Sequence, residues 1–139
     1  MIDLFQKVDF KSHAGLDLTW KIEMDALTPN EWDCISHMIR ELSPPFREVI
    51  GIPRGGNILG KLMNRHGTGK REDPICIVDD VLTTGGSMIE YAETEFGGED
   101  VIGWTVFARG QMPEWVNALF RMPYIDENGD LIKMIGIRD

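Results

Sequence analysis

The sequence predicts an α/β fold with a parallel sheet, and three observations support this fold class. Short apolar runs over residues 49–52, 75–78 and 101–108 have the length and continuous apolar character of strands that are buried on both faces. Glycine-rich turns and helical patterns follow the first two runs, and strands that alternate with helices form parallel sheets. Such sheets bind ligands at the carboxyl ends of their strands, where both turns would lie.

A helix is expected over residues 29–42, before the first of these strands. Thr28 and Glu31 have the spacing of a capping box, and Pro29 suits the first helical position. The helix should bury one face, because apolar residues recur there at helical spacing. These residues are Trp32, Ile35, Ile39 and Leu42.

The two ends of the chain give weaker patterns. Apolar residues alternate in part over residues 10–24, which predicts an extended or hairpin segment. Residues 113–120 are predicted to form a short helical piece. Asn128 and Gly129 stand between apolar residues and predict a tight hairpin turn.

Composition argues against several function classes. The chain has 139 residues, of which 42% are hydrophobic, as expected for one globular domain. Its net charge of -9 disfavours nucleic acid and anionic membranes as partners. Cys34 and Cys76 lack zinc-site spacing and are predicted to be buried thiols in a reducing, cytoplasmic environment. No apolar run could span a bilayer, and the first residues do not resemble a signal peptide.

The most informative segment covers residues 75–87. Asp79 and Asp80 follow an apolar run, and a loop of small and hydroxyl residues leads from them into a predicted helix. The loop consists of Thr83, Thr84, Gly85, Gly86 and Ser87. Glycines allow close approach to a ligand, and amides at a helix start bind phosphate. The carboxylates can accept hydrogen bonds from two adjacent ribose hydroxyls or hold Mg²⁺ through its water shell. The segment therefore predicts a ribose 5-phosphate site.

This segment resembles the signature of the type I phosphoribosyltransferases, which bind the ribose 5-phosphate of phosphoribosyl pyrophosphate (PRPP). The resemblance implies that Asp79 and Asp80 act in catalysis and in Mg²⁺ binding, and that residues 83–87 bind the substrate. It is not a P-loop, because the Gly-Lys-Ser/Thr ending is absent. The alternative is an α/β domain whose acidic strand end is merely solvated.

The earlier turn, residues 51–56, looks like the pyrophosphate loop of the same family, which contains an unusual cis peptide bond. The resemblance implies that Arg54 supplies a cation and that the amides of Gly55 and Gly56 face the leaving group. An ordinary turn with an exposed arginine is the alternative. Arg109 ends the third apolar run and, at the ligand-binding edge, could meet the base or a phosphate.

Two further segments bear on the subfamily and on catalysis. Residues 10–23 are similar to the hood that covers the base in orotate phosphoribosyltransferases, although Gln6 stands where that subfamily has a base-binding lysine. An ordinary amphipathic hairpin is the alternative. Residues 65–74 form a short connector where family members usually have another strand and a long mobile catalytic loop. Lys70 and Arg71 are either remnants of that loop's cations or part of an exposed connector.

The resemblance implies one domain over residues 1–139, with a hood-like segment 1–27, a Rossmann-like core 28–110 and a C-terminal segment 111–139. The implied activity is transfer of a 5-phosphoribosyl group between PRPP and a nitrogenous base, such as the pyrimidine orotate, with Mg²⁺ as cofactor. We expect a cytoplasmic homodimer that binds PRPP or a nucleoside monophosphate together with a small-molecule base. Because the catalytic loop is reduced, a non-catalytic PRPP or nucleotide sensor is the alternative.

Overall fold

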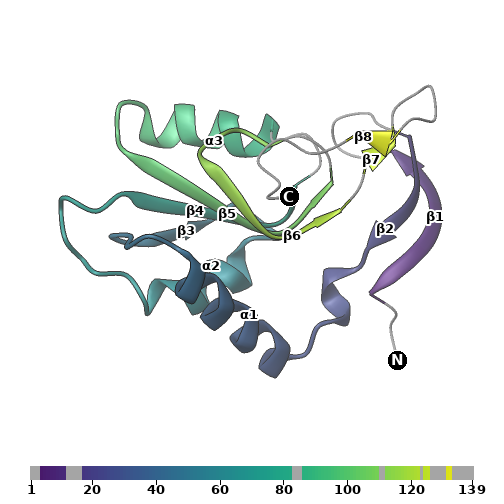
Figure 1. The fold of residues 1–139 in the computed structure, drawn as a ribbon, viewed down its shortest axis with the longest axis horizontal. Helices are drawn as coiled ribbons and strands as arrows, with labels where there is room; N and C mark the ends of the chain where they lie inside the picture. Colours follow the sequence, from purple (N-terminus) through teal and green to yellow (C-terminus); the bar gives the residue numbers. More distant parts are fainter. Residues whose placement is uncertain are drawn as a thin grey trace.

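The computed structural model of the protein describes residues 4–11, 17–82, 86–109, 112–122, 124–125 and 131–132. Its centre is a four-stranded parallel sheet with helices on both faces (Figure 1), which confirms the predicted fold class. The strand order is β3 (Val49–Gly51), β4 (Ile75–Leu82), β5 (Val101–Arg109) and β6 (Val116–Met122).

The helices separate the core into two apolar layers. Helices α1 (Pro29–Leu42) and α2 (Asn57–Asn64) cover one face of the sheet, and α3 (Gly86–Phe96) covers the other (Figure 1). Two residues after the end of helix α3, Gly98 has the left-handed conformation at φ 86° that glycine adopts readily. None of the helices in the described part of the chain has both the length and the apolar character needed to cross a membrane.

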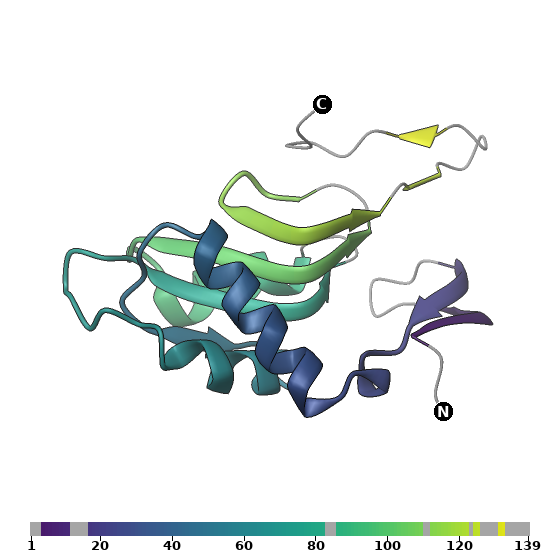
Figure 2. The same cartoon turned by 60° about the horizontal axis from the view of Figure 1, so that its bottom comes forward.

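Two hairpins lie outside this sheet. Strands β1 (Phe5–Lys11) and β2 (Asp17–Ile22) pair antiparallel, which confirms the expected hairpin and extends it toward the N-terminus. A 3₁₀ helix, η1 (Met24–Ala26), joins this hairpin to α1. The hairpin lies beyond the carboxyl ends of the sheet strands (Figure 2). Strands β7 (Tyr124–Ile125) and β8 (Leu131–Ile132) also pair antiparallel, and the turn predicted at residues 128–129 lies outside the described residues.

Strand β6 replaces the helix that was predicted over residues 113–120, so that prediction is wrong. β6 pairs in parallel with β5, and the pairs run from Gly103↔Val116 to Arg109↔Met122. The helical spacing of Trp115 and Leu119 misled the prediction because one chance pair can satisfy a helical period in a short segment. The segment forms a strand because it pairs with the buried β5 and completes the sheet. Such pairing outweighs a weak local pattern.

Helix α1 begins as its capping residues predict. The Thr28 hydroxyl accepts from the Glu31 amide at 3.2 Å, and the Glu31 carboxylate accepts from the Thr28 amide at 2.9 Å. Trp32, Ile35 and Ile39 are buried as predicted. The last residue of the predicted face, Leu42, is 65% exposed, because it is the final residue of the helix, next to Ser43, where the chain turns away.

The Thr28→Ala variant should lower the free energy of unfolding by about 1 kcal/mol, because it removes an N-cap acceptor and leaves the Glu31 amide without that partner. Urea unfolding at neutral pH measures this change. Thr94→Ala, at an exposed site inside α3, is the matched control and should be neutral or slightly stabilising, since alanine is the better helix former. Equal effects of the two substitutions would show that the capping box contributes nothing.

The two cysteines differ in their surroundings. Cys76 is fully buried in β4, and burial raises the pKa of its thiol to about 12. Cys34 is exposed on α1, so the prediction of two buried thiols is wrong for this residue. Cys34 lies between the buried positions of the helix and its solvent side, where a helical period alone does not resolve burial.

Candidate active site

The acid pair lies within β4 rather than after it. Strand β4 continues to Leu82, so Asp79 and Asp80 are strand residues, and both are partly buried. The Asp80 amide donates to Asp79 Oδ1 at 2.8 Å, and the Val81 amide donates to Asp80 Oδ1 at 2.7 Å. Each carboxylate is therefore oriented by the next backbone amide. A carboxylate has about four acceptor positions, so most of its capacity is left for a ligand.

Burial and the neighbouring carboxylate disfavour charge on Asp79. Desolvation raises the pKa of Asp79 to about 8, and the charge of neighbouring Asp80 acts in the same direction. Paired carboxylates at one site commonly hold a proton between them for this reason. A ligand that brings hydroxyl donors or a cation would favour the ionised form of Asp79. Such a ligand would therefore lower the pKa of this carboxyl group again.

The glycine-rich turn after β3 packs directly on this acid pair. A Cβ atom built on Gly55 would lie 2.6 Å from both carboxylate oxygens of Asp80, and one built on Gly56 would lie 2.4 Å from the Val78 carbonyl oxygen. The Ile52 amide also donates to that carbonyl at 2.9 Å. Only residues without a side chain allow this approach. The structure thus brings together the two motifs that the sequence places far apart.

The turn itself has features that bear on the pyrophosphate-loop interpretation. The peptide bond between Pro53 and Arg54 is cis, as the family resemblance implies. Arg54 and Gly55 are exposed, so both can meet a ligand. The Gly56 amide differs from expectation, because it donates to the Ile52 carbonyl at 2.8 Å. In this conformation Gly56 packs closely against β4. Its N–H is hydrogen-bonded within the turn and does not face a ligand.

The predicted phosphate loop is described only at its end. Gly86 and Ser87 open helix α3 and are exposed. Residues 83–85, which include Thr83, Thr84 and Gly85, lie outside the described residues. The first turn of α3 carries no acidic residue, so the positive end of the helix dipole is not offset there by a carboxylate. A strand that ends at Leu82 and a helix that begins at Gly86 are the elements that were predicted on either side of the loop.

Two arginines lie at the carboxyl edge of the sheet. Arg109 ends β5 one residue beyond Ala108, the partner of Leu82. Burial lowers the pKa of its guanidinium, which nevertheless remains protonated at neutral pH. Arg121 on β6 pairs with Ala108. It was not among the predicted site residues, because the strand that brings it to this edge was interpreted as helical over residues 113–120. The alternation of Val116, Ala118 and Phe120 was the signal that could have placed it on a strand.

An aromatic cluster joins the N-terminal hairpin to the same edge. The rings of Phe107 and Phe120 stack with centroids 5.3 Å apart, and Phe5 meets Phe107 edge-on at 6.1 Å. Phe5 and Phe120 are 50% and 41% exposed. The cluster therefore packs β1 against β5 and β6 and leaves two of its rings partly exposed.

The acid pair fits the predicted Mg²⁺ in one specific way. Within the described residues, no three His, Cys, Asp or Glu side chains are grouped so as to hold a metal ion by themselves. Mg²⁺ usually keeps several waters and binds through one or two carboxylates together with substrate phosphates. Asp79 and Asp80 could supply the one or two carboxylates of such a site, with waters and the substrate phosphates as the remaining ligands.

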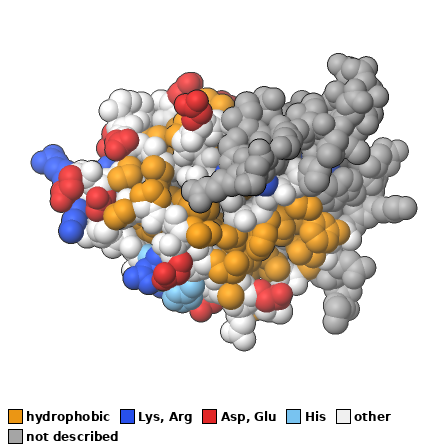
Figure 3. Space-filling view, viewed as in Figure 1, with side chains coloured by type: hydrophobic (Ala, Val, Ile, Leu, Met, Phe, Trp, Pro, Cys, Tyr) orange, Lys and Arg blue, Asp and Glu red, His pale blue; other side chains and the backbone are white. Residues whose placement is uncertain are grey.

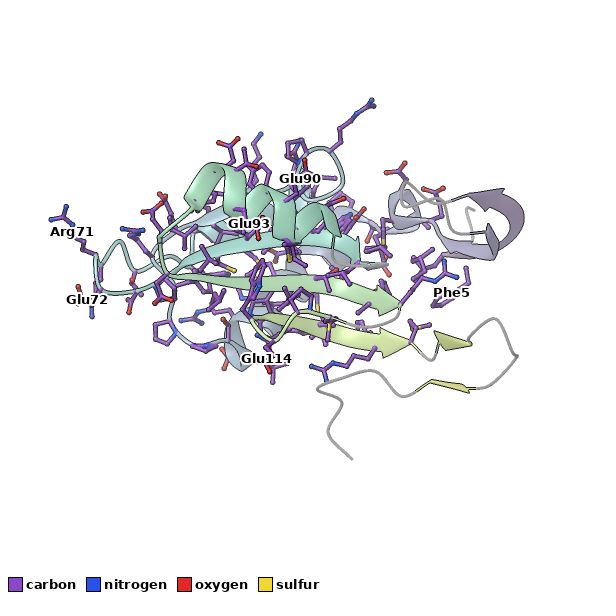
Figure 4. All side chains as sticks on the ribbon, turned by 90° about the horizontal axis from the view of Figure 1, so that it is seen from above. Phe5, Arg71, Glu72, Glu90, Glu93 and Glu114 are labelled. Carbon is purple, nitrogen blue, oxygen red and sulfur yellow. The ribbon has the colours of Figure 1, made fainter. Side chains whose placement is uncertain are left out.

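The connector at residues 65–74 lies at the opposite end of the sheet. The Thr68 and Gly69 amides donate to the carbonyls of Phe46 and Arg47, which precede β3, at 2.8 and 3.0 Å. Arg71 and Glu72 lie at one end of the molecule and Phe5 at the other (Figure 4), and charged side chains gather at the connector's end (Figure 3). The structure therefore favours the exposed-connector interpretation of Lys70 and Arg71.

Comparison with known proteins identifies the fold. No family model and no curated protein sequence matches the chain. An orotate phosphoribosyltransferase from Aeropyrum pernix is 18% identical, with a TM-score of 0.66 over 86% of this chain and 88% of that one. A UMP synthase from Leishmania donovani is 15% identical, with a TM-score of 0.70 over 86% of this chain and 34% of that one. A phosphoribosyltransferase from Corynebacterium diphtheriae is 15% identical, with a TM-score of 0.61 over 76% and 84%. The chain therefore has the type I phosphoribosyltransferase fold that its two glycine-rich motifs predict.

Proposed function

We propose that the protein transfers a 5-phosphoribosyl group between PRPP and a nitrogenous base, such as the pyrimidine orotate. The observation that carries this proposal is the packing of Gly55 against the Asp80 carboxylate. This packing brings the glycine-rich turn after β3 and the acid pair of β4 together at one edge of a parallel sheet, where ligands of such sheets bind. It supports a site in which the turn meets pyrophosphate and the acid pair meets the ribose. The orotate phosphoribosyltransferases and UMP synthase among the structural neighbours support the choice of base.

In this proposal each group meets one part of the substrate. Asp79 and Asp80 accept hydrogen bonds from the two ribose hydroxyls, and the start of α3 receives the 5-phosphate. The transition state has positive charge at the anomeric carbon, which the carboxylates stabilise, and negative charge on the departing pyrophosphate, which Arg54 stabilises. Mg²⁺, when bound, would add charge neutralisation on the pyrophosphate. The exposed ring of Phe120, which stacks on the buried Phe107, offers a surface on which the base can stack.

Ligand binding is the direct test of the site. Titration calorimetry with PRPP and Mg²⁺ should show binding that falls at least about a hundredfold in the Asp79→Asn/Asp80→Asn double variant, because two charge-assisted hydrogen bonds are weakened. Glu72→Gln, in the connector at the far end of the sheet, controls for the loss of negative charge and should leave the affinity unchanged. If neither PRPP nor a nucleoside monophosphate binds at millimolar concentration, this interpretation of the site is wrong.

The position of the connector favours a second candidate, a non-catalytic PRPP or nucleotide sensor. Since Lys70 and Arg71 lie at the amino end of the sheet, this segment cannot close over the ligand, and water in an open site competes with the base. Incubation with PRPP, Mg²⁺ and a panel of bases, orotate and uracil first, separates the two. Base-dependent pyrophosphate release that disappears in Arg54→Ala supports the enzyme. Tight binding without any release supports the sensor.

We also propose a cytoplasmic homodimer, in which a second copy supplies the cations and the cover that the connector does not. A symmetric dimer is the commonest oligomeric state. Light scattering at high protein concentration with PRPP present should give twice the mass of one chain. A monomer under those conditions would exclude a shared site.

A further inference from the structure

Thr105 on β5 is a fully buried polar residue beside the acid pair. Its side chain is 0% exposed, and the β4–β5 register pairs it with Asp79. Its hydroxyl lies within donating distance of two carbonyl oxygens, that of Asp80 at 3.1 Å and that of Phe107 at 3.0 Å. A buried hydroxyl is costly unless it is hydrogen-bonded, and valine would fill the same volume without that cost. A hydroxyl has a single hydrogen, which it donates to one of these carbonyls or shares between them, and this donation is what distinguishes threonine from valine here.

The Asp80 carbonyl lies at a gap in the strand pairing. The Cα pairs of β4 and β5 run from Asp79↔Thr105 directly to Val81↔Phe107 and skip Asp80. The Thr105 hydroxyl lies 3.1 Å from this carbonyl and can donate to it from the neighbouring strand. The hydroxyl thus adds a side-chain contact between β4 and β5 at the residue that the strand pairing skips.

The same peptide unit holds the Asp80 carboxylate. Because a peptide group is planar, the carbonyl of Asp80 and the amide of Val81 turn together. That amide donates to Asp80 Oδ1 at 2.7 Å. Fixing the carbonyl from one side therefore fixes the direction of the N–H that orients the carboxylate on the other. Such a chain of hydrogen bonds also polarises and strengthens its members.

The second acceptor links the acid pair to the aromatic cluster. Phe107 is the residue whose ring contacts both Phe5 and Phe120. One buried hydroxyl thus connects the strand segment that carries the carboxylates with the segment whose Phe107 ring supports the proposed base-stacking surface. Its removal would loosen the two parts of the site relative to each other.

We propose that Thr105 is a positioning residue for the acid pair. It does not touch the ligand; it holds the Asp80–Val81 peptide so that the Asp80 carboxylate faces the ribose hydroxyls. The proposal rests on the proposed function of the site, and it adds a residue from a neighbouring strand to the ligand-binding machinery.

The test compares Thr105→Val, which keeps the shape, with Thr105→Ser, which keeps the hydroxyl. Titration calorimetry with PRPP and Mg²⁺ should show about tenfold weaker binding for the valine variant, the loss expected for one misplaced hydrogen-bonding partner. The serine variant should bind within about threefold of the wild type. Urea unfolding separates this effect from a general loss of stability. Wild-type affinity in the valine variant, or equal losses in both variants, would overturn the proposal.

Two further measurements keep the test decisive. If the valine variant does not fold, Thr105→Cys replaces it, since a thiol is a weak donor of similar size; an intermediate loss of affinity is then expected, and full affinity overturns the proposal. If the wild type itself does not bind PRPP, the proposed function fails on its own. Amide hydrogen exchange at Val81 then decides the positioning role: faster exchange in Thr105→Val supports it, and unchanged exchange excludes it.

Discussion

The Gly55→Ala variant is expected to lose at least about a hundredfold in PRPP affinity while the protein stays folded. The added Cβ atom would lie 2.6 Å from both carboxylate oxygens of Asp80, closer than nonbonded atoms can approach. The short Asp80 side chain can relieve this contact only by rotating, which breaks its hydrogen bond from the Val81 amide. Misplacing a binding group by about 1 Å can cost a hundredfold, whereas the loss of this one partly buried hydrogen bond costs the fold only about 1 kcal/mol.

A double-mutant cycle tests this explanation. In an Asp80→Ala background the contact that opposes the new Cβ atom is absent, so Gly55→Ala should then cost little or no stability. The coupling free energy between the two substitutions, measured by urea unfolding, gives the cost of the contact between the new Cβ atom and the Asp80 carboxylate. Additive effects on stability would show that the Gly55 position is restricted for another reason. Unchanged PRPP affinity in Gly55→Ala would contradict the proposed role of the turn.

The free protein should become less stable as the pH rises from about 4 to about 8. Asp79 has a pKa of about 8 in the folded chain and ordinarily ionises near 4. Between those values the folded state holds a proton that the unfolded state has lost, so raising the pH favours unfolding. Asp79→Asn removes this dependence and should stabilise the free protein at pH 8.5 by on the order of 2 kcal/mol, after relaxation around the charge is allowed for.

The same variant should bind PRPP poorly, so that stability and binding change in opposite directions. Thermal unfolding from pH 4 to pH 9, with and without ligand, measures both effects. Asp100→Asn, at an exposed position before β5, is the control and should keep the pH dependence of the wild type. A wild-type stability curve that does not fall toward pH 8 would show that the acid pair is better solvated than its burial indicates.

Local patterns in the sequence predicted the parts of the fold that depend on local physics. The capping box at Thr28 and the apolar strand before Asp79 were correctly placed, because caps and buried strands are specified by neighbouring residues. The identity of β6 was not predicted, since it depends on pairing with β5. The contacts of Thr105 were also not predicted, because they cross between strands and leave no pattern along the chain.

The site was predicted in its residues but only partly in its geometry. The sequence placed Gly55 and Asp80 at the same edge of the sheet, but it did not show their direct contact. The position of the connector could have been deduced from topology alone. A helix that follows a parallel strand runs back toward the amino edge, so a short link from α2 to β4 must lie there. The comparison with full-length family members drew attention to the length of the connector rather than to its location.

The connector also makes the protein convenient to modify. Insertions in exposed loops are tolerated when the backbone around them stays hydrogen-bonded, and the entropic cost grows slowly with loop length. Lys70 and Arg71 are exposed, and the hydrogen bond from the Thr68 amide to the Phe46 carbonyl lies before them in the chain. An affinity tag or surface tether inserted between these two residues would hold the molecule by the end opposite the carboxyl edge of the sheet, where the proposed site lies. An immobilised protein of this kind would present every site to the solution in the same orientation.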